Sequence, residues 1–184
     1  EEVYCYTPKG DMVTLPKGAT ALDFAFNIHS DVGYHAISIK INNKLVPMSY
    51  VLENGDQNQV NTNKNQKPNE SWLKMVITGK ARTKIKQALK EEDKQQGEYG
   101  REELERKLSN QKLDFEENVD FLVKFFGFKS RLELYLGITT NQIKIDFKKF
   151  KIENNKLGLL PEVITKPKVE ELEEHQGKDA IVDN

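Results

Sequence analysis

The chain has 184 residues, of which 37% are hydrophobic and 31% are charged. This composition fills the cores of two small domains more easily than one large core. The 28 basic and 29 acidic residues give a net charge of -1, so overall charge neither indicates nor excludes a nucleic-acid partner. No apolar run approaches the length of a membrane span. The single cysteine, Cys5, cannot form an internal disulfide, and we expect a reducing, cytoplasmic location.

The first thirty residues predict a β-hairpin followed by a helix. Two short β-favouring runs within residues 3–15 are separated by a turn that contains Pro and Gly. Cys5 lies in the first run and is expected to be a small buried residue, not a reactive thiol. Thr20, with Asp23 three residues later, predicts a capping box at the start of a helix. The helix should bury one face and end at the following turn, residues 30–33; that face comprises Leu22, Ala25, Phe26 and His29.

Three further strands complete the first predicted domain. Ile37, Ile39 and Ile41 alternate with polar residues, as in a strand with one buried face. Short strands should follow at residues 45–46 and 58–62, the second after a tight turn. Two strands, one helix and further strands are the order of a β-grasp (ubiquitin-like) fold. We therefore predict an α+β protein with this domain over residues 1–63.

The remainder of the chain predicts a small all-α helical domain. Residues 64–70 are polar and turn-prone and indicate a linker, and residues 71–164 show apolar residues at helical spacing. We expect a break at Gly97 and Gly100 between helices; the expected helices cover residues 71–90, 101–113, 118–126, 130–136 and 141–150. Residues 165–184 are mostly polar and charged, and we expect a flexible tail there.

Several motifs resemble the TGS domain of RelA/SpoT proteins, and the resemblance extends into the second domain. They are Thr7-Pro8-Lys9-Gly10-Asp11, Ile28-His29-Ser30-Asp31-Val32-Gly33, Asn54-Gly55-Asp56 and the basic segment Gly79-Lys80-Ala81-Arg82-Thr83-Lys84-Ile85-Lys86 after Trp72-Leu73. The resemblance implies a stringent-response GTP pyrophosphokinase or (p)ppGpp hydrolase whose catalytic domains lie upstream. The sequence opens without Met on a strand-like run, so we expect preceding domains. This part would then be regulatory, with no catalytic residue and no cofactor.

The turn after the first helix offers a candidate RNA-binding site. Single-stranded RNA is held by aromatic rings that stack on bases and by cations that meet phosphates. Tyr34 and His35 follow Gly33 at this turn, with Lys40 further along the strand. The resemblance implies contact with the CCA 3′ end of uncharged tRNA on the ribosome; family members often have His where this chain has Tyr34. The alternative is that Tyr34 only packs on the turn.

A second candidate surface is the basic run that opens the second domain. Lys80, Arg82, Lys84 and Lys86 occur without an interleaved acid, which suits RNA or an acidic partner domain. The alternative is an ordinary solvated helix face.

Other function classes fit less well. A protein-interaction module that binds an acidic partner, such as acyl carrier protein, stays open beside RNA binding and contact with the protein's own upstream catalytic domains. A threonyl-tRNA synthetase domain is disfavoured because no editing-site cluster of His and Cys follows, and a sulfur carrier would need a terminal Gly-Gly. His29 and Asp31 lie close in sequence but lack a third ligand, so no metal site is predicted.

Overall fold

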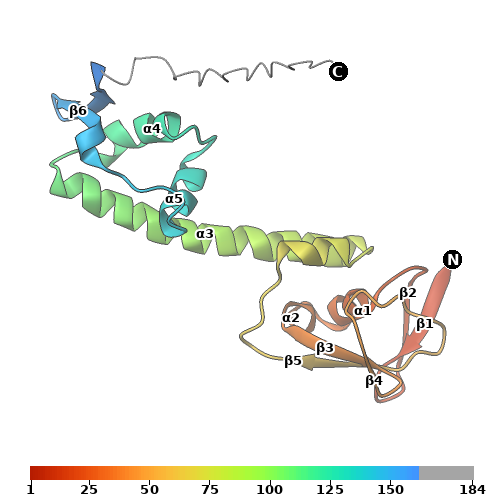
Figure 1. Cartoon of the computed structure of the whole chain (residues 1–184). Helices are drawn as coiled ribbons and strands as arrows, with labels where there is room; N and C mark the ends of the chain where they lie inside the picture. The colour runs from red at the N-terminus through yellow and green to blue at the C-terminus, as the bar shows by residue number, and fades with distance from the viewer. Residues whose placement is uncertain (162–184) are drawn as a thin grey trace, which may run out of the picture.

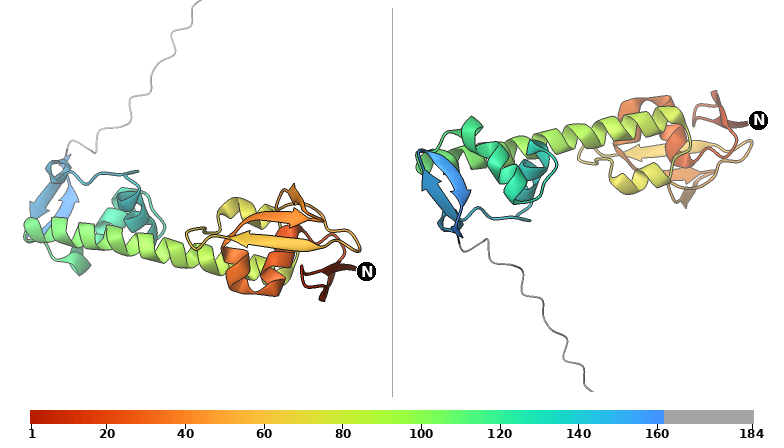
Figure 2. Two further views of the ribbon diagram at one scale, coloured as in Figure 1. Left: turned by 90° about the horizontal axis from the view of Figure 1, so that it is seen from below. Right: turned by 90° about the horizontal axis from the view of Figure 1, so that it is seen from above.

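A single long helix joins two separate cores in the computed structural model, which describes residues 1–161 (Figure 1). Helix α3 (Gly79–Asn110) has 32 residues and is therefore about 48 Å long at 1.5 Å per residue. Two further views show the β-grasp domain at one end of this helix and the smaller helices at the other (Figure 2). The predicted tail, residues 165–184, lies outside the described residues.

The N-terminal strands form the predicted β-grasp arrangement. Strands β1 (Glu2–Tyr6) and β2 (Met12–Pro16) pair as an antiparallel hairpin. A second sheet has the order β4-β3-β5, and a parallel bridge between Tyr6 and Gln57 joins it to β1; its strands are β3 (Ala36–Ile41), β4 (Lys44–Val46) and β5 (Asn58–Thr62). Cys5 is fully buried, and burial raises the pKa of its thiol to about 11, which confirms its expected place in the core.

One strand differs from the predicted alternation. A bulge between Ala36 and Ser38 shifts the register of β3 against β5, so that Ala36 is buried and the Ile37 side chain is 48% exposed. Ile39 and Ile41 are buried as predicted. A bulge inserts one extra residue into a strand, so side chains before and after it that share an alternation in the sequence point to opposite faces of the sheet. The sequence pattern alone gives no sign of this bulge.

Helix α1 (Ala21–Ile28) begins with the predicted capping box. The Asp23 amide donates to Thr20 Oγ1 at 3.3 Å, and the Thr20 amide donates to Asp23 Oδ2 at 2.9 Å. The expectation that His29 is buried on this helix is wrong. His29 has an extended backbone between α1 and a second short helix, and its Nδ1 accepts from the Asp31 amide at 3.1 Å, which leaves the ring 68% exposed. That second helix, α2 (Ser30–Tyr34), stands where a turn was predicted.

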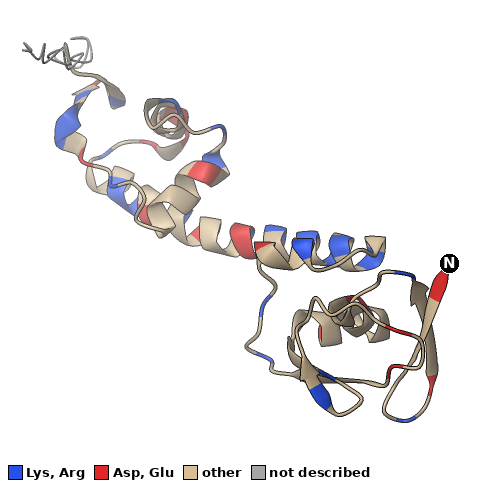
Figure 3. Cartoon of the chain, turned by 45° about the vertical axis from the view of Figure 1, so that its right-hand side comes forward, with Lys and Arg blue, Asp and Glu red and all other residues tan. Residues whose placement is uncertain are grey.

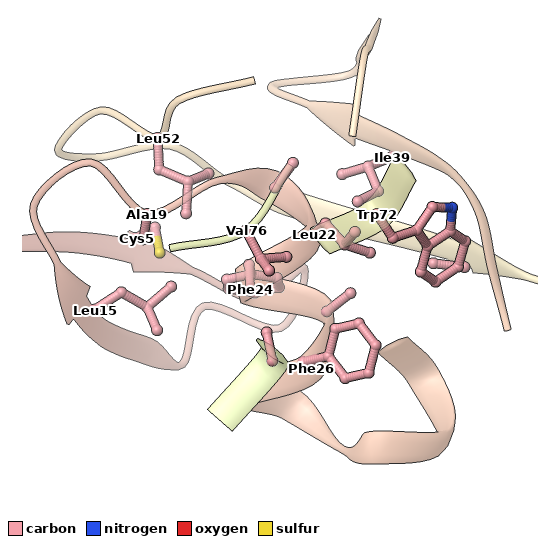
Figure 4. Packing of buried hydrophobic residues seen from close by; sticks show 14 of the residues in the cluster. Cys5, Leu15, Ala19, Leu22, Phe24, Phe26, Ile39, Leu52, Trp72 and Val76 are labelled. Carbon is pink, nitrogen blue, oxygen red and sulfur yellow. The ribbon is translucent and has the colours of Figure 1, made fainter. Parts of the chain in front are cut away.

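Asp23 also attaches the β-grasp domain to α3. Its buried carboxylate accepts from the backbone amides of Ile77 and Thr78, both at 3.1 Å, and from Thr78 Oγ1 at 2.7 Å. Thr78 is in turn the N-cap of α3. Four apolar side chains complete the first core. Trp72 of η1 (Glu70–Lys74) and Val76 after it are labelled in Figure 4, and Ala81 and Ile85 come from the start of α3. The first turns of α3 therefore belong to the β-grasp core.

The predicted break at Gly97 and Gly100 is wrong, because α3 continues through both glycines. Both are buried, and a Cβ at Gly100 would overlap the carbonyl of Tyr135. Tyr135 belongs to α5 (Arg131–Thr139), which crosses α3 at this point and follows α4 (Phe115–Phe125). The glycines thus allow two helix backbones to approach closely, at a cost in helix propensity of about 1 kcal/mol each.

The predicted helix over residues 141–150 is also wrong. Only a short turn, η2 (Phe147–Lys149), is helical, and an antiparallel hairpin of β6 (Phe150–Glu153) and β7 (Lys156–Leu159) follows. Asn154 and Asn155 have φ of 52° and 60° at its tip, the backbone that a two-residue hairpin turn requires. Ile143, Phe147 and Phe150 do lie at helical spacing, but only Phe147 belongs to η2, and Phe150 begins β6 and is buried in the second core.

Candidate nucleic-acid interface

Tyr34 is the last residue of α2 and lies half-buried against the β-grasp core. Its ring meets Phe26 edge-on, with 5.6 Å between centroids and an interplanar angle of 84°. Gly33 allows this approach, because a Cβ there would overlap the Phe26 ring. Burial, with a smaller effect from the charge of Asp31, raises the pKa of the Tyr34 phenol. The phenol is therefore neutral near pH 7 and can both stack and donate a hydrogen bond.

The remaining edge of Tyr34 lines a hollow of about 260 Å³ between the β-grasp domain, the linker and α3. His35 shares it, and its Nδ1 lies 2.8 Å from the carbonyl oxygen of Asp31. The ring nitrogen must donate in this contact, so Nε2 remains free to accept when the imidazole is neutral. The other walls come from distant segments: Gln66, Lys67, Pro68, Ala88, Glu91, Glu92 and Gln95.

Acidic and basic groups share the rim of this hollow. Lys67 Nζ lies 3.0 Å from a Glu92 carboxylate oxygen, and hydrogen bonds from Lys67 and Gln96 lower the pKa of Glu92. Glu91 is exposed beside this pair. A string of phosphates would meet these carboxylates, whereas a single base or sugar could reach Tyr34. The hollow therefore suits a chain end better than the middle of a strand.

Lys40 does not lie with Tyr34 and His35. It lies on β3 opposite Leu45 and Gln59, and it lines a separate, smaller hollow with Pro8, Asn43, Gln57 and Gln59. The open face of the sheet thus presents Lys40 among amide side chains. The structure separates the sequence-predicted RNA-binding residues of this domain into two places.

The basic run forms the first two turns of α3, seen as a blue stretch in Figure 3. Lys80 Nζ donates to the Asn27 carbonyl at 3.4 Å, at the negative end of α1, and Arg82 donates to the Val76 carbonyl at 3.3 Å. Lys84 is half-buried and Lys86 is exposed. Neither has a side-chain partner among residues 1–161. Two cations of the run thus have internal roles, and two are available to a ligand.

Sequence reasoning missed the linker and α3 walls of the Tyr34 hollow. Gln66 also donates to the Ala36 carbonyl at 3.2 Å, which fixes the linker beside β3. Most of these residues are polar and form no motif in the sequence, and only the fold brings them to Tyr34. Within the described part of the chain, no three His, Cys, Asp or Glu side chains gather as metal ligands, and no helix is long and apolar enough to cross a membrane.

The sequence is similar to known proteins along most of its length. The family model for the TGS domain matches residues 3–62. A guanosine-3′,5′-bis(diphosphate) 3′-pyrophosphohydrolase of Aquifex aeolicus is 39% identical over 160 residues, covering 83% of this chain and 23% of that protein. A GTP pyrophosphokinase of Escherichia coli K12 is 34% identical over 176 residues, covering 93% of this chain and again 23% of the relative.

A GTP pyrophosphokinase of Myxococcus xanthus is 41% identical over 116 residues, covering 62% of this chain and 15% of that protein. The chain thus spans less than a quarter of the length of these curated relatives. The match begins in the β-grasp domain and extends well beyond it, as the basic segment after Trp72 predicts. The chain therefore belongs to the RelA/SpoT family, with a TGS domain followed by a helical region.

Proposed function

We propose that this chain is the non-catalytic, regulatory part of a (p)ppGpp synthetase or hydrolase, and that its TGS domain senses the 3′ end of uncharged tRNA on the ribosome. The relatives named above act in making or breaking this nucleotide, and the chain is similar to less than a quarter of each. The observation that supports the proposal most directly is the half-buried Tyr34 beside His35 at the edge of a hollow open to solvent.

The geometry favours recognition of a chain end. The hollow of about 260 Å³ is close to the size of one nucleoside, and the carboxylates of Glu91 and Glu92 disfavour phosphates on its α3 side. A free terminal ribose carries two hydroxyl groups, and an amino acid esterified to one of them adds bulk and a positive amine. A hollow of about the volume of one nucleoside would not also hold the added amino acid, so an uncharged tRNA would bind better.

Helix α3 suits a relay between the TGS domain and the rest of a longer protein. Its first turns pack in the TGS core and are held by Asp23, and its last turns pack in the second core. A tRNA that binds the TGS domain in only one arrangement of the parent would shift the population between its catalytic states. The catalytic domains, the ribosome and the tRNA are the partners in this proposal.

Binding of the whole chain to one tRNA in its uncharged and aminoacylated forms tests the proposal. We expect tighter binding of the uncharged form, and loss of that preference in Tyr34→Ala, since stacking on one base contributes about 1–3 kcal/mol. Tyr34→Phe keeps the ring and should keep most of the preference. Tyr4→Ala, which removes a 42% exposed ring on β1, is the matched control. Equal, salt-driven binding of both tRNA forms would contradict the proposal.

A second candidate function is the binding of an acidic protein, such as acyl carrier protein, to the basic start of α3. Lys84 and Lys86 have no side-chain partner among residues 1–161, and a cationic helix surface attracts an anionic protein as well as RNA. A binding experiment with competing tRNA separates the two candidates. Acyl carrier protein that binds the wild-type chain, loses that binding in Lys86→Glu and is not displaced by added tRNA would favour this second candidate.

A further inference from the structure

The second core ends in a hairpin that carries a concentration of lysines. Residues 144–159 contain two acids, Asp146 and Glu153, and five lysines: Lys144, Lys148, Lys149, Lys151 and Lys156. All five lysines are exposed. The chain as a whole has nearly equal numbers of acids and bases, so this local excess of positive charge is a property of the hairpin region.

Both acids of the region are already engaged. The Asp146 carboxylate accepts from the Lys148 amide at 3.1 Å and caps η2. Glu153 lies 2.8 Å from Lys151 Nζ. The other four lysines have no ion pair among residues 1–161. The surface therefore keeps a net positive charge that its own carboxylates do not neutralise.

The fold holds this surface rigidly. Phe150 and Leu157 are buried in the second core, and Asn118 of α4, itself 1% exposed, binds the hairpin through its amide. Its Nδ2 donates to the Asn155 carbonyl at 3.1 Å, and its Oδ1 accepts from the Leu157 amide at 2.8 Å. Lysines on a fixed hairpin lose less conformational freedom on binding than lysines on a mobile loop.

The side-chain types favour a phosphate ligand over a protein. The cations are all lysines, and no arginine or exposed aromatic ring accompanies them in residues 144–159. Protein interfaces are enriched in Arg and aromatic residues and depleted in Lys, whereas lysines bind phosphates as point charges. An acidic stretch of α3, red in Figure 3, separates this hairpin from the basic start of the helix.

We propose that the β6–β7 hairpin with η2 is a second RNA-binding surface, which holds the phosphate backbone of double-stranded RNA without reading its sequence. It extends the proposed function, because it would grip a duplex region while the TGS domain meets a 3′ end. The TGS domain and the hairpin lie towards opposite ends of α3 (Figure 1). A protein that uses both would bind one large RNA assembly at two places.

The test is the salt dependence of binding to a blunt RNA duplex that lacks a single-stranded 3′ end. Each lysine–phosphate contact contributes about 0.7–0.9 to the slope of log K against log salt. The triple variant Lys148→Gln, Lys149→Gln, Lys156→Gln should lower the slope by about 2 and weaken binding at low salt at least tenfold. The control variant Lys94→Gln, Lys112→Gln, Lys129→Gln changes the same charge at exposed positions and should bind nearly as the wild type.

Thermal unfolding of both triple variants checks that they fold. Equal losses in the two variants, or an unchanged slope in the first, would overturn the proposal. Polyglutamate that displaces the duplex at equal charge concentration would also overturn it, in favour of an acidic protein. Tyr34→Ala should bind the blunt duplex as the wild type does, so failure of the hairpin surface and failure of 3′-end sensing are distinguishable.

Discussion

The two ends of α3 are fixed by opposite means. At its N-terminal end a buried carboxylate, Asp23, collects hydrogen bonds from Thr20, Ile77 and Thr78 and joins two elements by polar contacts. Towards its C-terminal end the absence of side chains at Gly97 and Gly100 allows α5 to pack against the helix backbone. Beside the apolar packing at both ends, the first junction adds a charged group with full hydrogen bonding, and the second adds a close approach of two helices. Substitutions should therefore affect the two ends independently.

Gly100→Ala should give the largest loss of stability. In an exposed helix this change stabilises by about 1 kcal/mol, but here the new Cβ would overlap the Tyr135 carbonyl, which is backbone and cannot turn away. We expect a loss of about 3 kcal/mol in the free energy of unfolding, measured in urea. Gly79→Ala is the control, since a Cβ there meets nothing within 4 Å. A neutral Gly100→Ala would show that α5 does not pack closely on α3.

Asp23→Asn should give a smaller loss, located at the other end. An amide presents a donor where the carboxylate accepts from both Thr78 groups and from Ile77. We expect about 2 kcal/mol, since hydrogen bonds to a charged group contribute about 1.5–3 kcal/mol each and some will be retained. Asp31→Asn, on a 73% exposed side chain, should change the stability little. Equal effects of the two substitutions would show that Asp23 does not hold α3.

The single thiol can report which core opens. Cys5 is fully buried in the first core, and its pKa is raised to about 11, so a thiol reagent at pH 8 should react only through opening of that core. Asp23→Asn should raise the labelling rate about 30-fold, the equivalent of 2 kcal/mol. Gly100→Ala should leave the rate near that of the wild type. Similar acceleration in both variants would show that the two cores open together.

The first core was predictable and the second only in part, for a physical reason. In the TGS domain the capping box of Thr20 and Asp23 and the glycine turns are local signals that agree with the tertiary structure. In the second region, glycines that break isolated helices are retained for close packing, and residues 141–150 form only the short turn η2 before the hairpin of β6 and β7. Helix propensity is weak enough for packing to override it.

The residues of the candidate site also fall into those that local sequence predicts and those that only the fold brings together. Tyr34 and His35 could be proposed because they directly follow a helix and a glycine. The role of Asp23 at α3, and the linker and α3 walls of the hollow near Gln66 and Glu91, depend on contacts between segments more than thirty residues apart. No local pattern encodes them. The separation of Lys40 from Tyr34 likewise follows from the strand running away from the turn.

Lys80→Ala should have a smaller effect than Gly100→Ala or Asp23→Asn. Its ammonium group is exposed and lies near the carbonyl end of α1, a contact that contributes about 0.3–0.5 kcal/mol and weakens in salt. Lys86→Ala, which removes an exposed lysine without a partner among the described residues, should change the stability even less. Thermal unfolding at low and high salt compares the two variants. A loss above about 1 kcal/mol would indicate that Lys80 helps to attach α3 to the TGS domain.

The most direct test of 3′-end sensing is to titrate the isotope-labelled chain with the trinucleotide CCA and follow backbone amide resonances by NMR. We predict that the shifts concentrate at Tyr34, His35 and the linker near Lys67, and that a CCA aminoacylated at its 3′ end produces much smaller shifts. Shifts confined to the open sheet face around Lys40, or equal shifts with both trinucleotides, would contradict the account.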